Sequence, residues 1–149
     1  WRDDYNQSAF EAARYLSVLA SFEHTVRERE DVQEELHAKL DLALLWLARS
    51  LAGPNPAACP ASIGLETMRW SDGQALEPGK QGAVVLNLST DLPFLLQLPA
   101  YVRSCQAVDG RWQIDVDLQI TDEALRDGWE RTVFRRHRRM IQQERGGQA

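Results

Sequence analysis

The sequence predicts an α+β protein in which long N-terminal helices precede a small antiparallel β-barrel and a closing C-terminal helix. Residues 8–51 contain neither Gly nor Pro, and their apolar residues recur at alternating spacings of three and four, which indicates helix. After the Gly and Pro cluster at 53–56, apolar residues alternate with a period of two in consecutive short segments, which indicates antiparallel strands. We therefore expect a helical oligomerisation arm at 1–56 and a barrel with its closing helix at 57–149.

The predicted first helix begins at a capping box, in which the Ser8 hydroxyl accepts a hydrogen bond from the backbone amide of Glu11. Apolar positions along the helical region fall on one heptad frame, which Arg29 and Gln33 interrupt in the middle. Such a frame is the seam of a coiled coil or helical hairpin, and a short barrel offers too little surface to cover it. We therefore expect an oligomer interface rather than a purely intramolecular core. Its predicted residues are Tyr15, Leu19, Phe22, Val26, Leu36, Leu40, Ala43 and Leu47.

The charged centre at 27–31 leaves open whether this region is one helix or two. Asp31 with Glu34 can start a second helix or lie on the solvated face of a continuous one. A continuous helix would span about 65 Å, more than a domain of this size can bury, so it would have to pack against another chain. Two antiparallel helices would instead pack partly on each other, and we prefer this version.

Two strands are predicted before the middle of the barrel. The segment 63–70 forms the first, and 71–73 forms a turn after it. The second strand is expected at 82–89, where alternate apolar residues share one face. These residues are Val84, Leu86 and Leu88.

The second half of the barrel contains the clearest turn in the chain. The segment 92–108 supplies one or two strands, with Pro93 and Pro99 expected at strand ends or sheet edges because proline cannot donate to a ladder. The dipeptide Asp109–Gly110 then predicts a tight hairpin turn. The last strand, 111–120, alternates apolar with polar side chains and is expected to be half-buried.

The closing helix is predicted to begin at Thr121 or Asp122 and to end at about Glu144. Between 126 and 145 there are seven arginines and three acidic residues, so a basic helix lies on an otherwise acidic body. The arginines at 135–139 can bind an anion, or they can lie solvated near the helix C-terminus. The apolar stripe of this helix consists of Leu125, Trp129, Val133 and Met140.

Composition argues against several classes of function. The net charge of −5 disfavours a general nucleic-acid binder, because phosphate binding needs a dominant positive field. No apolar run is long enough for membrane insertion and no export leader is visible, so we expect a cytoplasmic protein. There is no phosphate-binding glycine loop, nucleophile elbow or HExxH motif, so we expect neither enzymatic activity nor a cofactor. Cys59 and Cys105 lie far apart, and we expect them to be reduced, buried and free of metal.

The order and spacing of the barrel segments resemble a PilZ domain, which is a six-stranded barrel finished by a C-terminal helix. The resemblance is carried by 59–70, 77–88, 107–120 and 135–145, none of which is specific by itself. PilZ domains usually bind cyclic di-GMP through an RxxxR motif before the barrel and a DxSxxG motif on an early strand. Guanidinium groups of the first motif suit guanine and phosphate, and the carboxylate of the second accepts from guanine N–H groups.

This chain departs from both motifs. In the best register of the second motif, Cys59 replaces Asp, Ala61 replaces Ser, and only Gly64 is kept, so the carboxylate acceptor is absent. No RxxxR motif lies upstream of the barrel. Arg135 and Arg139 have that spacing, but they belong to the closing helix.

The long upstream helices are similar to those of a tetrameric PilZ branch, in which heptad-bearing helices join the subunits and the nucleotide-binding residues are missing. This resemblance implies a non-catalytic signalling or adaptor protein of the bacterial cytoplasm that self-assembles, as a tetramer rather than a dimer, and acts on a protein partner. It further implies that cyclic di-GMP does not bind. The alternative is a receptor for cyclic di-GMP or another nucleotide that uses Arg135 and Arg139, and a third possibility is a helical dimerisation module unrelated to PilZ.

Overall fold

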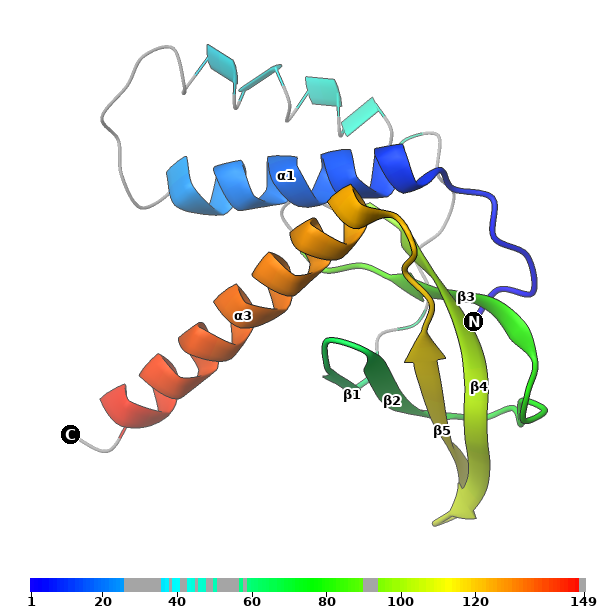
Figure 1. The fold of residues 1–149 in the computed structure, drawn as a ribbon. Coiled ribbons are helices and arrows are strands. Elements are labelled where there is room, and N and C mark those ends of the chain that lie inside the picture. The colour runs from blue at the N-terminus through cyan, green and yellow to red at the C-terminus, as the bar shows by residue number, and fades with distance from the viewer. Residues whose placement is uncertain are drawn as a thin grey trace.

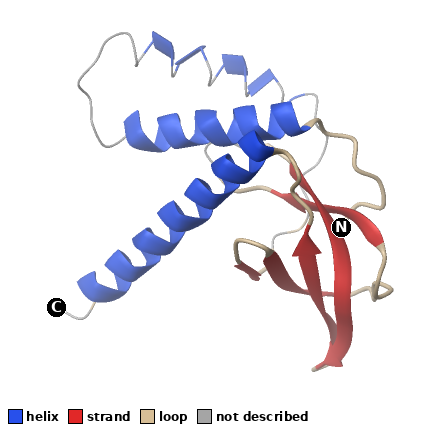
Figure 2. Ribbon diagram, in the orientation of Figure 1, coloured by secondary structure: helices blue, strands red, loops and turns tan. Residues whose placement is uncertain are grey.

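The protein combines one curled antiparallel sheet with helices packed at one end of it (Figures 1 and 2). The computed structural model describes residues 1–25, 36, 37, 39, 40, 43, 44, 46, 47, 50, 57, 59–89 and 94–147. Its elements in chain order are α1 (Ala9–Thr25), β1 (Ala61–Ile63), β2 (Thr67–Asp72), β3 (Gln81–Leu86), β4 (Leu96–Val108), β5 (Arg111–Leu118) and α3 (Glu123–Gly146).

The sheet has five strands in the described residues, in the order β1-β2-β5-β4-β3, and every neighbouring pair is antiparallel. The predicted α+β class and antiparallel sheet are confirmed, whereas the predicted sixth strand is not shown. The outer edge of β3 is partly covered by the N-terminus, because Arg2 and Ala83 exchange two backbone hydrogen bonds of 2.9 and 2.8 Å. The sheet is therefore a curled half-barrel extended at one edge by a single bridge.

The segment 63–70, predicted to be one strand, is divided between β1 and β2. A tight turn separates them, in which the Gly64 amide donates to the carbonyl of Thr67 at 2.9 Å. The two strands then pair with each other, with Ile63 opposite Met68. The prediction of one strand was wrong because it took the apolar residues at 63, 65, 68 and 70 as one alternation, whereas the spacing of three between Leu65 and Met68 falls at the turn.

The predicted one or two strands at 92–108 form one long strand, β4, which pairs first with β3 and then with β5. The ladder shifts register between Val102 and Ser104, and such irregularities increase strand twist. Pro99 lies within β4 opposite Ala83, before the pairing with β5 begins at Ala100. The Pro99 carbonyl accepts from the Gln119 amide at 2.7 Å, so the N–H that proline lacks would point to this same neighbour, just beyond the end of β5, where the β4–β5 ladder stops.

The predicted hairpin and helix starts are confirmed. Asp109 and Gly110 both have positive φ, 51° and 76°, as the mirror-image turns of two-residue hairpins require. The Glu11 amide donates to the Ser8 hydroxyl at 3.1 Å at the start of α1. The carboxylate of Asp122 accepts from the Leu125 amide at 2.8 Å and caps α3.

Helix α1 shares a hydrophobic core with β4 and with α3. The predicted division at residue 56 assigns α1 to the arm, whereas its buried face packs among residues of β4 and α3. The Tyr15 ring also stacks on Phe94 with centroids 4.5 Å apart. The buried residues of this cluster are Ala12, Tyr15, Leu16, Leu19, Leu88, Leu96, Leu98, Ile120, Leu125 and Trp129. A second cluster fills the other end of the sheet and comprises Met68, Trp70, Val84, Ala100, Val102, Ile114 and Val116.

This packing corrects the expectation that Tyr15 and Leu19 contact a second copy of the chain. They are 2% and 0% exposed and leave no surface for another subunit, because the barrel and α3 already cover that face of α1. Phe22 is partly buried against the same cluster. Val26 lies outside the described residues.

The described residues between 36 and 50 are helical and exposed. In Figure 1 they do not lie on the continuation of the α1 axis, which favours two helices over one continuous helix. The charged centre at 27–31, where the two would be joined, and the Gly and Pro cluster at 53–56 lie outside the described residues. Among the described helices, none is long and apolar enough to cross a membrane.

Candidate functional site

The remnant of the DxSxxG motif lies on β1 and in the turn that follows. Cys59 is exposed, contrary to the prediction that it is buried, and Ala61 pairs with Trp70 at the start of the sheet. Gly64 lies in the β1–β2 turn, where an added Cβ would stand 3.2 Å from the carbonyl oxygen of Thr67. These three positions place no carboxylate and no hydroxyl at the turn.

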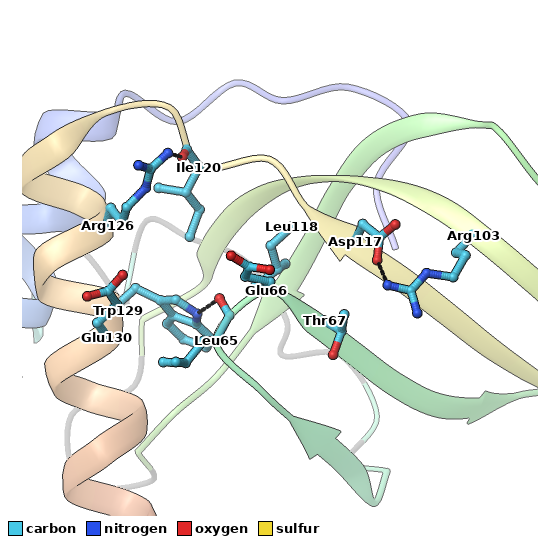
Figure 3. Close-up of a pocket in the computed structure, with 10 residues that line it drawn as sticks. All are labelled: Leu65, Glu66, Thr67, Arg103, Asp117, Leu118, Ile120, Arg126, Trp129 and Glu130. Carbon is cyan, nitrogen blue, oxygen red and sulfur yellow. Dashed lines mark hydrogen bonds and ion pairs between the residues drawn. The ribbon is translucent and has the colours of Figure 1, made fainter.

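A hollow of about 440 Å³ lies directly beyond this turn, between the start of β2, the end of β5 and the first half of α3 (Figure 3). Its wall includes the ring of Trp129, which is 1% exposed and whose indole N–H donates to the Leu65 carbonyl at 3.2 Å. That hydrogen bond fastens α3 to the β1–β2 turn. The lining residues are Leu65, Glu66, Thr67, Arg103, Asp117, Leu118, Ile120, Arg126, Trp129 and Glu130.

The charged groups of this hollow are unfavourable for an anionic ligand. Arg103 is paired with Asp117, and the hydrogen bond from Arg103 holds the pKa of the Asp117 carboxyl below its usual value. Arg126 donates to the carbonyl of Ile120 at 2.7 Å. Both guanidinium groups of the lining are therefore already engaged, and Glu66 and Glu130 add two further carboxylates.

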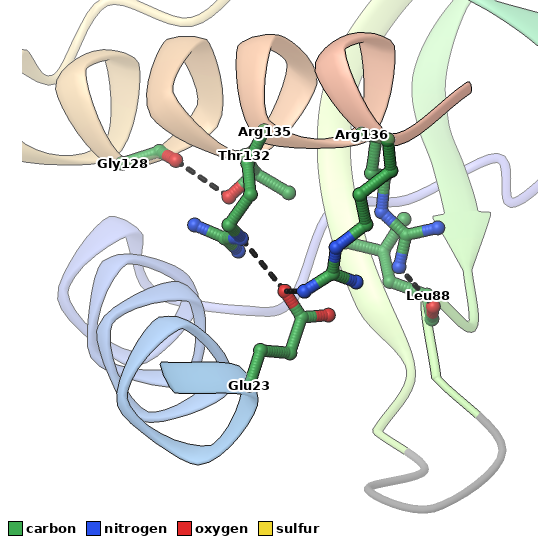
Figure 4. Close-up of polar contacts among 7 residues, drawn as sticks. Glu23, Leu88, Gly128, Thr132, Arg135 and Arg136 are labelled. Atoms are coloured by element: carbon green, nitrogen blue, oxygen red, sulfur yellow. Dashed lines mark hydrogen bonds and ion pairs between the residues drawn. The ribbon is translucent and has the colours of Figure 1, made fainter. Parts of the chain in front are cut away.

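A second polar site lies where α3 crosses α1. Arg135 and Arg139, selected from the sequence by their spacing, lie one helical turn apart on the same face of α3. Both contact one carboxylate oxygen of Glu23, which accepts from Arg135 Nε at 2.7 Å and from Arg139 Nη2 at 3.1 Å (Figure 4). The two arginines are thus brought together, and in this structure they join two helices of the same chain.

Arg136 lies beside this pair and extends toward Leu88, whose carbonyl accepts a hydrogen bond from Arg136 Nη2 (Figure 4). Three buried guanidinium nitrogens have no hydrogen-bond partner in the described part of the chain: Arg135 Nη2, Arg136 Nε and Arg139 Nε. We call Glu23, Arg135, Arg136 and Arg139 the arginine cluster. The arginine run indicated part of it, whereas nothing in the sequence indicated Glu23, because its role depends on how α1 crosses α3.

Tyr15 lies close enough to the arginine cluster to be influenced by its charges. Burial of its ring raises the pKa of its hydroxyl to about 12, with Arg136 lowering this pKa and Glu23 raising it. The hydroxyl is therefore neutral and can donate a hydrogen bond at physiological pH. The cluster thus borders on a buried polar group of α1.

The predicted interface residues that follow α1 form a third candidate site. Leu36, Leu40 and Leu47 are 62%, 57% and 61% exposed, and Ala43 is also exposed. Leu44 and Trp46, both 60% exposed, add to this apolar surface. We call these residues the exposed apolar helix.

The structure shows no cluster of His, Cys, Asp and Glu side chains that could hold a metal ion within its described residues. Cys59 and Cys105 are both free thiols. The described residues therefore contain three candidate sites. They are the hollow lined by Glu66, Asp117 and Glu130, which we call the acidic hollow, the arginine cluster and the exposed apolar helix.

Comparison with known proteins identifies the family. Residues 19–146 match a family model described as "Atypical PilZ domain, cyclic di-GMP receptor". A solved structure from Xanthomonas campestris is 28% identical, with a TM-score of 0.77, over 92% of this chain and 82% of that one. It is described as a pathogenic protein with a new tetrameric PilZ domain self-assembled via an unusual helical bundle. No curated protein matches. Because the family model spans most of the sequence and agrees with the curled sheet and closing helix, the chain belongs to the atypical PilZ domain family.

Proposed function

We propose that this protein is a non-catalytic signalling adaptor of the cytoplasm that self-assembles through the exposed apolar helix and does not bind cyclic di-GMP. The single observation that carries the proposal is the exposure of Leu36, Leu40 and Leu47 on described helical residues. Side chains of this kind stabilise a helix only when another surface covers them. Tyr15 and Leu19 are covered by the chain itself, so the available interface begins after α1.

The occupant of the exposed apolar helix is a second copy of the chain. The tetrameric Xanthomonas PilZ domain is self-assembled via a helical bundle, and this chain is similar to it over 92% of its length. Leucines spaced three and four apart are suited to packing between parallel or antiparallel helices. We therefore favour a tetramer, with a dimer as the simpler alternative.

The acidic hollow supports the absence of cyclic di-GMP binding. Cyclic di-GMP carries two phosphodiester charges, whereas the hollow beside Gly64 is lined by more carboxylates than guanidinium groups. Arg103 and Arg126 would have to leave their present partners to reach a phosphate. The position of the motif Asp is occupied by Cys59, which supplies no acceptor for guanine.

Sedimentation and light scattering test the assembly. We expect the wild-type protein to have a multiple of the 16.9 kDa chain mass, and Leu40→Asp to be monomeric because it places a charge in the seam. Phe134→Asp is the matched control, since Phe134 is an exposed apolar residue of α3, 51% exposed, outside the proposed seam. A wild-type monomer at micromolar concentration would overturn this proposal, as would an unchanged mass for Leu40→Asp.

A second candidate function is a nucleotide receptor that uses the arginine cluster. The family to which the chain belongs is described as a cyclic di-GMP receptor, and Arg135 and Arg139 each retain a buried nitrogen without a partner among the described residues. Calorimetry with cyclic di-GMP separates the two functions. Saturable micromolar binding that is lost in Arg135→Gln and Arg139→Gln supports the receptor, and no heat of binding supports the adaptor.

A further inference from the structure

The arginine cluster has more positive charge than its acidic partner can balance. In the described part of the chain, the guanidinium groups of Arg135, Arg136 and Arg139 lie beside a single carboxylate, that of Glu23. The side chains of Arg135 and Arg139 are 23% and 32% exposed, and that of Glu23 is 12% exposed. All ion pairs of these arginines within the described residues go to Glu23. Partly buried cations without a counter-charge are costly, because burial removes the water that would otherwise solvate them.

The hydrogen bonds of the cluster are incomplete in the same place. Arg135 Nη2, Arg136 Nε and Arg139 Nε are buried and make no hydrogen bond to any of the residues that the structure describes. Buried donors are nearly always paired in folded proteins, so unpaired donors on three neighbouring guanidinium groups indicate an absent acceptor. A water molecule can accept from such donors, but it brings no charge. An anion supplies both the missing negative charge and the missing hydrogen-bond acceptors.

The geometry favours an oxyanion of the phosphate type. Figure 4 shows Arg135 and Arg136 leaving the same side of α3, with Arg135 reaching Glu23 and Arg136 reaching the Leu88 carbonyl. Guanidinium groups present several N–H donors in a plane, which suits the multiple acceptor oxygens of phosphates. A single halide offers no such set of separate oxygens.

We infer that the arginine cluster is a binding site for a phosphate-type oxyanion, held between α1, α3 and the segment at Leu88 by Arg135, Arg136 and Arg139. Inorganic phosphate and the phosphodiester of a nucleotide share this chemistry. The part of this inference that concerns a nucleotide rests on the receptor candidate described above. The argument for the site does not require that the protein self-assembles. Glu23 then competes with the anion for the same guanidinium groups.

Because Glu23 and phosphate compete, removing an arginine and removing Glu23 should change phosphate affinity in opposite directions. The full chain is titrated with inorganic phosphate at constant ionic strength, with chloride as the replaced anion, and binding is followed by calorimetry and by the NMR signals of the arginine Nε–H groups. Arg139→Gln removes a donor and a positive charge, and we expect phosphate binding to weaken about tenfold or more. Glu23→Gln removes the competing charge while keeping a similar shape, and we expect phosphate binding to tighten by about tenfold.

The matched control is Arg131→Gln, which removes the same charge from the exposed side of α3. Arg131 is 76% exposed and pairs only with Asp127 in the described residues, so we expect phosphate affinity to change by less than about twofold. An equal loss in Arg131→Gln would show general attraction to a basic helix and overturn the site. So would an absence of saturable phosphate binding, or weaker binding in Glu23→Gln.

Two further readouts cover the remaining outcomes. If Arg139→Gln fails to fold, the NMR signals of the Arg136 and Arg139 Nε–H groups in the wild type test the site instead. We expect these signals to shift with phosphate and not with chloride, and the absence of a phosphate-specific shift would overturn the site. A parallel titration with cyclic di-GMP distinguishes the source of the phosphate. Binding of phosphate without cyclic di-GMP supports the site and refutes a cyclic di-GMP receptor, whereas binding of neither refutes both.

Discussion

Leu19→Ala tests whether a residue of the heptad frame packs in the core of its own chain or at an interface between copies. Leu19 is fully buried in the core shared by α1, the barrel and α3, although it belongs to the same frame as the exposed Leu40. Replacement by Ala removes three buried carbons, each contributing about 0.8 kcal/mol of transfer free energy, or about 2.4 kcal/mol together. The cavity left behind adds to this, so we expect a total loss of about 3–4 kcal/mol in the free energy of unfolding.

The assay is urea unfolding of Leu19→Ala in the Leu40→Asp background, compared with Leu40→Asp alone. In a monomeric background the cost cannot come from an interface between copies, and with a urea dependence of about 2 kcal/mol per molar it lowers the midpoint by about 1.5–2 M. The loss should also be independent of protein concentration. A loss below about 1 kcal/mol in this background would refute an intrachain role of Leu19.

Two further predictions concern the sheet. In Gly82→Ala the new Cβ would stand 2.4 Å from the carbonyl oxygen of Arg2. We therefore expect the free energy of unfolding to fall by about 1–3 kcal/mol, with faster hydrogen exchange at the bridge between Arg2 and Ala83. The control is Gly73→Ala, which should be close to neutral because no atom lies within 4 Å of its new Cβ. An equal effect of both changes would contradict the steric argument. At Asp115, burial is the largest single influence and raises the pKa. The hydrogen bonds from Arg69 and Ser104, together with the positive charges of Arg69 and Arg103, outweigh it, so the folded-state pKa lies below the ordinary 3.8. This stabilisation is complete above pH 3.8 and is lost as the pH falls through the folded-state pKa, so the advantage of wild type over Asp115→Asn in urea unfolding should shrink in acid; a constant difference between pH 7 and pH 2 would contradict it.

Local signals in the sequence predicted local structure well. The turn at Asp109–Gly110 and the caps at Ser8 and Asp122 depend on residues close in sequence, and all three are confirmed. The turn at Gly64 was missed because a single glycine in a short apolar segment does not distinguish a bend in one strand from a turn between two.

The sites were less predictable because they depend on how distant elements meet. The heptad frame cannot show that Leu19 is covered within the chain while Leu40 is not, since both satisfy the same periodicity. Similarly, the spacing of Arg135 and Arg139 predicts a shared helical face, but only the crossing of α1 with α3 places Glu23 against that face. The acidic hollow unites strand and helix residues far apart in sequence, and no sequence motif marks it.

The position of Glu23 connects the two proposed properties of the molecule. It lies in the last turns of α1, whose preceding residues are fixed in the core, so an anion that competes for Arg135 and Arg139 acts on the end of α1 rather than on its docking. The exposed apolar helix follows this end in the chain. If the two sites are coupled, phosphate must change the self-association constant of the wild type, and Glu23→Gln must reduce that change because no ion pair remains to be broken. Equal phosphate effects on both proteins would show that assembly and anion binding are independent.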